Sequence, residues 1–191
     1  MSFDMELSVA MEAADRAADL IFREYQSFIA IPDAPVSIST HVDKASQELI
    51  LGFLHDRFPN DALCAEESVP GFENVPTSGP RTWVVDPIDG TRGFARKMGQ
   101  FSVMIGLLVN GRPVVGVVAE PAQKRVTYAR VGGGCWSHTH DATAIRCRTT
   151  QSSRVPAPCP CRRARRMAWS SRLRIISGCR CRSGNFSRPG S

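Results

Sequence analysis

Hydrophobic residues recur every three or four positions in two stretches near the start of the chain. The first stretch predicts a long amphipathic helix, with one apolar face made of Leu7, Met11, Ala14, Ala18, Ile21, Tyr25 and Phe28. Pro32 and Pro35 should end this helix. A polar link then leads to a second helical pattern, which Pro59 closes and whose apolar positions are Ala45, Leu49, Ile50, Phe53 and Leu54. We expect both apolar faces to belong to the core.

The pattern then changes to short apolar runs, rich in β-branched residues, that are typical of strands. These runs cover residues 62–65, 82–85, 101–109, 113–119 and 126–131. Asn110 and Gly111 join two of them and are a strong hairpin signal. The three glycines 132–134 should break the meander. Two helices followed by strands predict an α+β lobe, a layered α/β sandwich.

Composition places the chain among globular proteins, because 42% of its 191 residues are hydrophobic. It has no run of eighteen apolar residues, and its N-terminus is acidic rather than basic followed by an apolar core. We therefore expect a soluble cytoplasmic protein with no membrane partner.

The net charge of +6 arises in the C-terminal tail. The last 43 residues carry ten of the 24 Lys and Arg and none of the 18 acidic residues, so residues 1–148 have a net charge of −4. Four of the seven cysteines also lie in this tail. Without a secretory signal, a disulfide framework is not expected.

Acidic residues gather where the predicted strands and helices begin or end. The stretch WVVDPIDGT runs from an apolar strand into Asp86 and Asp89, Glu66 follows another strand, and Asp43 precedes the second helix. Burying such acids without a partner is costly. Hard cations such as Mg²⁺ prefer carboxylate, carbonyl and water oxygens, with substrate phosphate as a further ligand. Pro87 stiffens the turn, so both aspartates and the Ile88 carbonyl could converge on one cation.

A short helix predicted from Thr91 would supply free N–H groups for an anion beside this cluster. A metal cluster beside an anion site is the geometry of a phosphatase, in which two cations clamp the attacking water and the leaving oxygen. The alternative is that these acids are solvated loop residues. A haloacid-dehalogenase type is excluded, because its two acids are one residue apart whereas Pro87 and Ile88 separate them here.

Three motifs together resemble the inositol monophosphatase superfamily of Mg²⁺-dependent, lithium-sensitive phosphatases. Residues 83–91 match its Asp-Pro-Ile/Leu-Asp-Gly-Thr segment after a Trp-containing strand, and Glu66-Glu67-Ser68 matches its Glu-Glu-Ser. Residues 40–43 match its Thr-x-Ala-Asp, with Val42 in place of Ala. The resemblance implies the family's sandwich fold, of which this chain would form the N-terminal lobe.

The resemblance also implies roles for individual residues. Glu66, Asp86 and the Ile88 carbonyl would hold a first Mg²⁺, Asp86 and Asp89 would share a second, and Asp43 would bind a third through water. Thr91, with Glu66 or Asp43, would orient and deprotonate the nucleophilic water. The backbone of Gly90 and Thr91 would receive the phosphate. No covalent intermediate is expected.

The substrate would be a small phosphorylated metabolite, with lithium as an inhibitor and a homodimer left open. Residues 90–94, 99–103 and 116–121 resemble the 3′(2′),5′-bisphosphate nucleotidase branch more than the inositol branch. A basic residue after the Thr often accompanies nucleotide substrates, which makes Arg92 a candidate substrate contact. Arg92 could equally be a solvated surface charge. The Lys that the family tends to carry before its Thr-x-Ala-Asp segment is absent between Arg23 and Lys44.

The resemblance covers residues 5–136, and the family normally continues into a second α/β domain. That domain supplies a Trp-Asp-x-Ala segment that completes the second metal site, and this chain has no Trp-Asp pair. We expect a phosphatase lobe at 1–136, a transition at 137–148 and a disordered or irregular tail at 149–191. Our hypothesis is a frameshift near 137–148, which would leave an impaired enzyme or an inactive, aggregation-prone remnant.

Two other interpretations of the tail stay open. Cys159, Cys161, Cys179 and Cys181 could bind zinc, although paired zinc cysteines are usually two residues apart and these have one intervening residue. The arginines of residues 162–166 could bind nucleic acid, but no recognition fold accompanies them, so only non-specific contact is expected.

Overall fold

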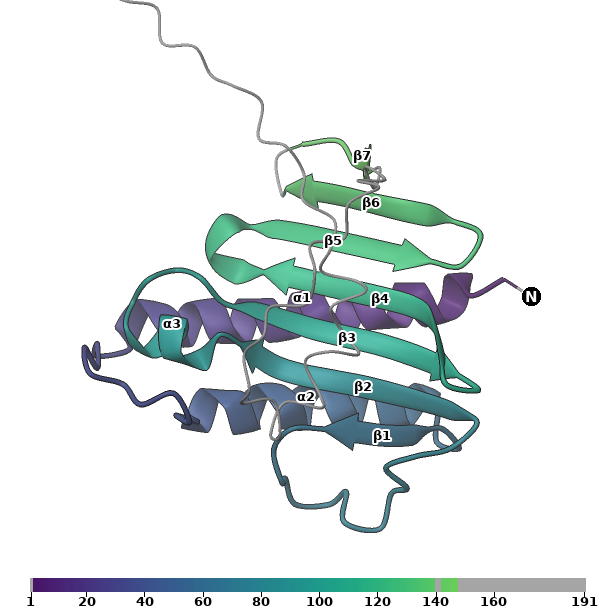
Figure 1. The fold of residues 1–191 in the computed structure, drawn as a ribbon, viewed down its shortest axis with the longest axis horizontal. Coiled ribbons are helices and arrows are strands. Elements are labelled where there is room, and N and C mark those ends of the chain that lie inside the picture. Colours follow the sequence, from purple (N-terminus) through teal and green to yellow (C-terminus); the bar gives the residue numbers. More distant parts are fainter. Residues whose placement is uncertain (1, 140–141, 148–191) are drawn as a thin grey trace, which may run out of the picture. The chain divides into compact units, whose positions relative to one another are not determined.

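The computed structural model describes residues 2–139 and 142–147, and shows a mixed sheet with two long helices on one of its faces (Figure 1). Its main compact unit ends at Arg146. The elements, in chain order, are α1 (Asp4–Ser27), α2 (His41–Arg57), β1 (Ala62–Ala65), β2 (Arg81–Asp89), α3 (Thr91–Ala95), β3 (Ser102–Val109), β4 (Arg112–Glu120), η1 (Pro121–Gln123), β5 (Arg125–Arg130), β6 (Gly134–Thr139) and β7 (Ile145–Cys147). The predicted α+β lobe with layered helices and sheet is confirmed.

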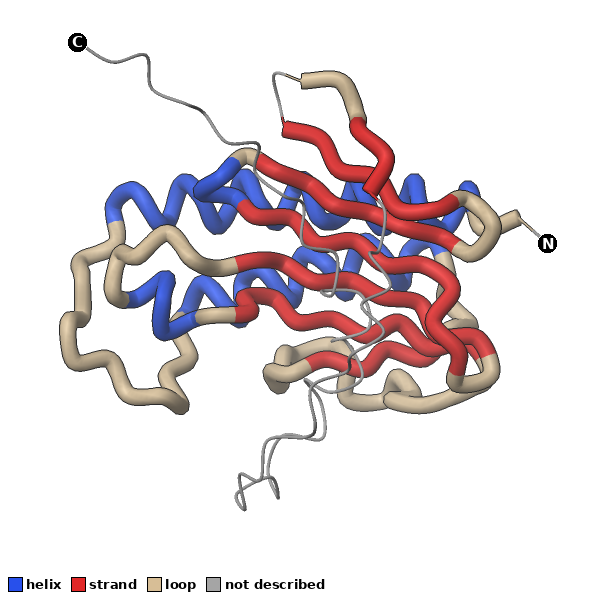
Figure 2. The backbone as a smooth tube through the Cα atoms, turned by 45° about the horizontal axis from the view of Figure 1, so that its top comes forward, coloured by secondary structure: helices blue, strands red, loops and turns tan. Residues whose placement is uncertain are grey.

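The seven strands lie in the sheet in the order in which they occur along the chain. β1 pairs with β2 in parallel, and β2 to β6 pair as an antiparallel meander (Figure 2). The β3–β4 hairpin turns at Asn110 and Gly111, whose φ angles are 49° and 75°. Two consecutive left-handed residues define the turn type that the sequence predicts.

Helix α1 lies on the sheet through small side chains. Its fully buried positions are Ala10, Ala13, Ala14, Ala17 and Ile21, spaced three and four residues apart. Of the predicted apolar face, Ala14 and Ile21 are fully buried, and Leu7, Met11, Ala18, Tyr25 and Phe28 are partly buried and pack against the core. Alanines at the contact let the helix axis approach the sheet closely, so the larger residues fill the flanks of the helix.

Helix α2 begins with a capping box at Thr40 and Asp43. Its buried face contains the expected Ile50 and Leu54, but it also contains three polar side chains, those of Asp43, Ser46 and Gln47. The predicted Ala45, Leu49 and Phe53 lie beside this face rather than in it. One end of the buried face is therefore polar, at the end of α2 that approaches the tip of β2.

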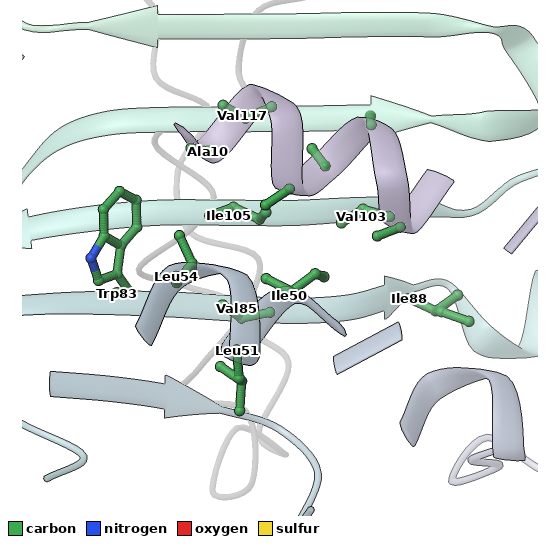
Figure 3. Packing of buried hydrophobic residues seen from close by; sticks show 14 of the residues in the cluster. Ala10, Ile50, Leu51, Leu54, Trp83, Val85, Ile88, Val103, Ile105 and Val117 are labelled. Carbon is green, nitrogen blue, oxygen red and sulfur yellow. The ribbon is translucent and has the colours of Figure 1, made fainter. Parts of the chain in front are cut away.

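The core lies between the two helices and the central strands. Trp83, Val85 and Ile88 of β2 point towards the helices, beside Val103 and Ile105 of β3 (Figure 3). Ile50, Leu51 and Leu54 of α2 pack onto them. Alternate residues of β2 therefore face the core, and the residues between them face the other side of the sheet.

Two sequence expectations about the strands need correction. β2 begins at Arg81 and continues to Asp89, four residues beyond the predicted end, because Asp86 and Asp89 still pair with β3. Gly132 and Gly133 lie in a turn that does not end the meander, since β6 begins at Gly134 and pairs with β5. β7 lies within residues 137–148, which we expected to be a transition.

The predicted disordered tail, zinc site and arginine segment lie outside the described residues. None of the described helices combines the length and hydropathy needed to span a bilayer.

Candidate metal and phosphate site

A bulge near the end of β2 places both aspartates on one face of the sheet. Asp86 pairs with Met104 and Asp89 pairs with Ser102, so three steps along β2 match two steps along β3. Met104 and Ser102 are two residues apart and share a face, and their partners therefore share it too. The extra residue lies at the Pro87-Ile88 step, where Pro removes a ladder donor at no cost. This explains why the two acids are three residues apart.

The chain then turns sharply from β2 into the short helix α3. Gly90 has a φ of 89°, and a Cβ at this position would lie 2.8 Å from the Gln100 carbonyl oxygen. A Cβ at Gly93 would lie 2.5 Å from the same oxygen. Only glycine fits at either position, so the segment after the aspartates is held tightly against residue 100. Helix α3 begins at Thr91, which is the start that the sequence predicts.

Asp43 and Thr91 connect helix α2 to this turn. The Asp43 carboxylate is almost fully buried, and its Oδ2 accepts from the backbone N–H and the hydroxyl of Thr40, at 2.8 and 2.6 Å. Its Oδ1 lies 2.8 Å from the Thr91 hydroxyl, which is also 2.9 Å from the Ile88 carbonyl oxygen. The Thr91 hydroxyl thus has two acceptors for one proton. Both Asp43 and Ile88 orient it.

Glu66 and Asp86 meet at the adjacent ends of the parallel strands β1 and β2. The charge of Glu66 contributes to raising the pKa of Asp86. Burial, the neighbouring Glu67, Asp43 and Asp89 together raise the pKa of Glu66. Desolvation also raises the pKa of Asp89, although that side chain is exposed at the end of its strand. The cluster therefore contains more negative charge than it can hold ionised.

Asp86 is the most strongly affected member of the cluster. Burial first, and then the charges of Glu66, Asp89 and Asp43, raise its pKa to about 7, while a hydrogen bond from the Ile88 N–H acts in the opposite direction. Its Oδ1 is buried without any hydrogen-bond partner. An orphaned carboxylate oxygen among other acids is the setting that a bound cation would satisfy.

Within residues 2–139 and 142–147, no three His, Cys, Asp or Glu side chains stand close enough together to form a ready-made metal site. The Asp43 carboxylate instead accepts hydrogen bonds from the hydroxyls of Thr40 and Thr91. The donor set nevertheless fits a hard cation, since it consists of carboxylates and a carbonyl, with Asp86 Oδ1 left over.

Arg92 has a definite contact in this structure. Its Nε donates to the Ala34 carbonyl oxygen at 2.9 Å, and the Ile31 N–H donates to the Ala95 carbonyl oxygen at 2.8 Å. These two bonds fasten the loop between α1 and α2 to α3. Arg92 is exposed, and its side chain bonds the backbone of this loop beside the turn that carries Thr91.

Sequence analysis missed two polar residues that contact the candidate site. Ser46 donates to the Pro87 carbonyl oxygen at 3.4 Å, and Gln47 bonds the backbone of Glu67. Both are fully buried. A signal for them was available, because they stand three and four residues after Asp43 and so share its helix face.

The sequence model of the inositol monophosphatase family matches residues 4–190. The chain is 35% identical over 136 residues to a histidinol-phosphatase of Chlorobaculum parvum, covering 69% of this chain and 50% of that protein. It is 33% identical over 133 residues to the 3′(2′),5′-bisphosphate nucleotidase CysQ of Escherichia coli, covering 68% and 53%.

Solved structures show the same relationship. The structure of an inositol monophosphatase from Anabaena matches with a TM-score of 0.61 and 28% identity, covering 80% of this chain and 52% of that one. The chain thus spans about half the length of the relatives it matches. The family match runs to residue 190, beyond the residues where we place a frameshift. With its motifs, fold and matched length in agreement, the chain belongs to the inositol monophosphatase family.

Proposed function

We propose that this chain carries the metal and phosphate site of a Mg²⁺-dependent phosphomonoesterase that acts on a small phosphorylated metabolite. The observation that carries the proposal is the partly buried Asp86 carboxylate, whose Oδ1 is buried without a hydrogen-bond partner and whose pKa is raised to about 7 by burial and by neighbouring acids. A buried acid surrounded by acids is a liability unless a cation neutralises it. The family relationship supports Mg²⁺ as that cation.

The residues that would hold Mg²⁺ follow from the donor set. Glu66, Asp86 and the Ile88 carbonyl would form a first site, Asp86 and Asp89 would share a second, and Asp43 would contribute to a third through water. A bound Mg²⁺ would neutralise phosphate charge and lower the pKa of a water molecule at this site.

The remaining groups would orient the reacting molecules. Thr91 is held by Asp43 and Ile88, so its hydroxyl can align a water and pass a proton towards Asp43 or Glu66. The backbone N–H groups of Gly90 and Thr91 would receive the phosphate, since the tight turn at residue 90 leaves the start of α3 open to an anion.

The relatives differ in the substrates that their names state, which include histidinol phosphate, bisphosphate nucleotides and inositol phosphate. We favour a 3′-phosphoadenosine 5′-phosphate-like nucleotide for this chain, on the motif resemblance and on the position of Arg92. Its Nε is used by Ala34, so Arg92 would contact a nucleotide through the far end of its guanidinium.

The test is phosphate release by the full chain with three substrates: 3′-phosphoadenosine 5′-phosphate, inositol 1-phosphate and histidinol phosphate. Release should require Mg²⁺, should be inhibited by Li⁺, and should fall in Asp86→Asn by at least the roughly 10–100-fold that loss of an outer-shell partner costs. Glu48→Gln removes an exposed acid from α2 and should leave the rate unchanged. Robust release that survives Asp86→Asn would refute the metal assignment.

A further inference from the structure

Gln47 forms an unusual contact with the segment that carries Glu66. Its side chain is fully buried on α2, one helical turn after Asp43. The Glu67 N–H donates to Gln47 Oε1 at 2.8 Å, and Gln47 Nε2 donates to the Glu67 carbonyl oxygen. One side-chain amide thus satisfies both backbone groups of a single residue.

This contact lies where the sheet no longer holds the chain. The last β1–β2 pair is Ala65 with Val85, so Glu66 and Glu67 stand beyond the ladder. A side-chain amide has the donor and acceptor geometry of a backbone peptide, and Gln47 therefore acts as one further strand partner. Without it, the backbone next to Glu66 would lose two directional bonds just where the chain enters the loop of residues 66–80.

Helix α2 makes related contacts with the other parts of the site. Ser46 reaches the carbonyl of Pro87 at the bulge, and Asp43 holds the Thr91 hydroxyl. Three polar side chains on one helix face therefore touch the three segments on which the candidate ligands and Thr91 lie. The sequence positions 43, 46 and 47 match the spacing of a single helix face.

We propose that Gln47 is a positioning residue: by bonding both backbone groups of Glu67, it holds the Glu66 carboxylate beside Asp86 and so sets the Mg²⁺ affinity of the site. The inference rests on the proposed function, since it concerns the same metal site. Gln47 itself would not touch the metal, the substrate or the reacting water.

The test compares Mg²⁺ affinity, measured by titration calorimetry of the full chain, in Gln47→Met and in Ile50→Val. Methionine has a similar length but makes neither bond with Glu67, and the affinity should fall about 10–100-fold, as for other outer-shell partners. Ile50→Val removes one buried methyl group from the next turn of the same helix. It should lower the thermal stability without changing the affinity, which separates positioning from general destabilisation.

Gln47→Glu provides a second and sharper variant, which keeps the side-chain size if Gln47→Met does not fold. The new carboxylate can still accept from the Glu67 N–H but cannot donate to its carbonyl. Added negative charge alone would strengthen Mg²⁺ binding, whereas lost positioning would weaken it. A weaker affinity and faster hydrogen exchange at the Glu67 amide are expected.

Wild-type affinity in Gln47→Met, or a tighter affinity in Gln47→Glu, would overturn the proposal. The Asp86→Asn variant, titrated with Mg²⁺ in parallel, distinguishes a failure of the Gln47 role from a failure of the proposed metal site. If Asp86→Asn loses Mg²⁺ binding while Gln47→Met keeps it, only the role of Gln47 is wrong. If the wild type and Asp86→Asn bind Mg²⁺ equally, the proposed function fails, and the role of Gln47 fails with it.

Discussion

Acidic side chains gather at both ends of strand β2, but the two groups differ in the partners that the protein provides for their charge. At the start, Arg81 bonds Asp61 at 2.8 Å and Glu6 at 3.2 Å, and the indole N–H of Trp83 donates to the second oxygen of Asp61 at 3.0 Å. The hydrogen bond with Asp61 is also the main reason that the pKa of Arg81 is raised. The acids of this cluster thus have a cation and an indole N–H of the protein itself as partners.

At the far end of β2, the charges that act most strongly on Asp86 all come from other acids. Asp86 Oδ1 is buried without a hydrogen-bond partner. Burial of acidic side chains alone therefore does not indicate a ligand-binding site. Acids whose charges are paired by other side chains of the protein stabilise the fold, whereas a group of acids without such partners indicates that a ligand binds there.

The largest effect on stability should come from removing Arg81, the cation that pairs with Asp61 and Glu6. Arg81→Ala leaves Asp61 and Glu6 buried without a cation, and we expect a loss of about 3 kcal/mol in the free energy of unfolding, at the lower end for a buried pair because Arg81 is itself 34% exposed. Urea unfolding measures the loss. It should be equal with and without Mg²⁺, and a loss that Mg²⁺ restores would contradict the separation of the two clusters.

A smaller effect should follow when Mg²⁺ binds to the acids around Asp86. Mg²⁺ at about 100 times its dissociation constant should stabilise the wild type by about 2.7 kcal/mol, because the cation binds only the folded chain. Thermal unfolding at increasing Mg²⁺ concentration measures this gain. Asp86→Asn should show little gain, while Asp61→Asn, matched in chemistry at the other end of β2, should gain as much as the wild type. Equal gains in both variants would argue against a cation at Asp86.

The smallest effect concerns pH in the absence of metal. The pKa of Asp86 is raised to about 7, whereas an aspartate in the unfolded chain titrates at about 3.9. Between about pH 4 and pH 7 the folded protein keeps a proton that the unfolded chain has released, so the free energy of unfolding should fall as the pH rises. Asp86→Asn removes this titration.

At pH 8 without metal, Asp86→Asn should therefore be about 1 kcal/mol more stable than the wild type, a figure that allows for solvent screening. Thermal unfolding in a chelator from pH 4 to pH 8 measures the difference, with Glu48→Gln as the control for an exposed acid. Parallel pH profiles for the wild type and Asp86→Asn would show that Asp86 does not carry the excess charge.

Much of the architecture was predictable from local patterns. The two helices, the strand of residues 62–65 and the Asn110-Gly111 turn appear where periodicity and turn chemistry place them. The sequence predictions were less accurate where contacts with neighbouring helices and strands determine the structure. The fully buried positions of α1 are mostly alanines because the sheet favours close approach there, and β2 extends to Asp89 because β3 pairs with it across a bulge.

By itself, the sequence determined the family, the element types and which oxygen-bearing residues are candidates for a cation site, because helix and strand periods, turn residues and the WVVDPIDGT motif are local properties of the chain. Only the tertiary structure decided which acids remain unneutralised. Asp61 and Asp86 are both buried or partly buried aspartates, but only the fold places Arg81 beside one and three further acids around the other. The same holds for Gln47, because its partner stands 20 residues away in the sequence and only the packing of α2 on β1 and β2 brings the two together.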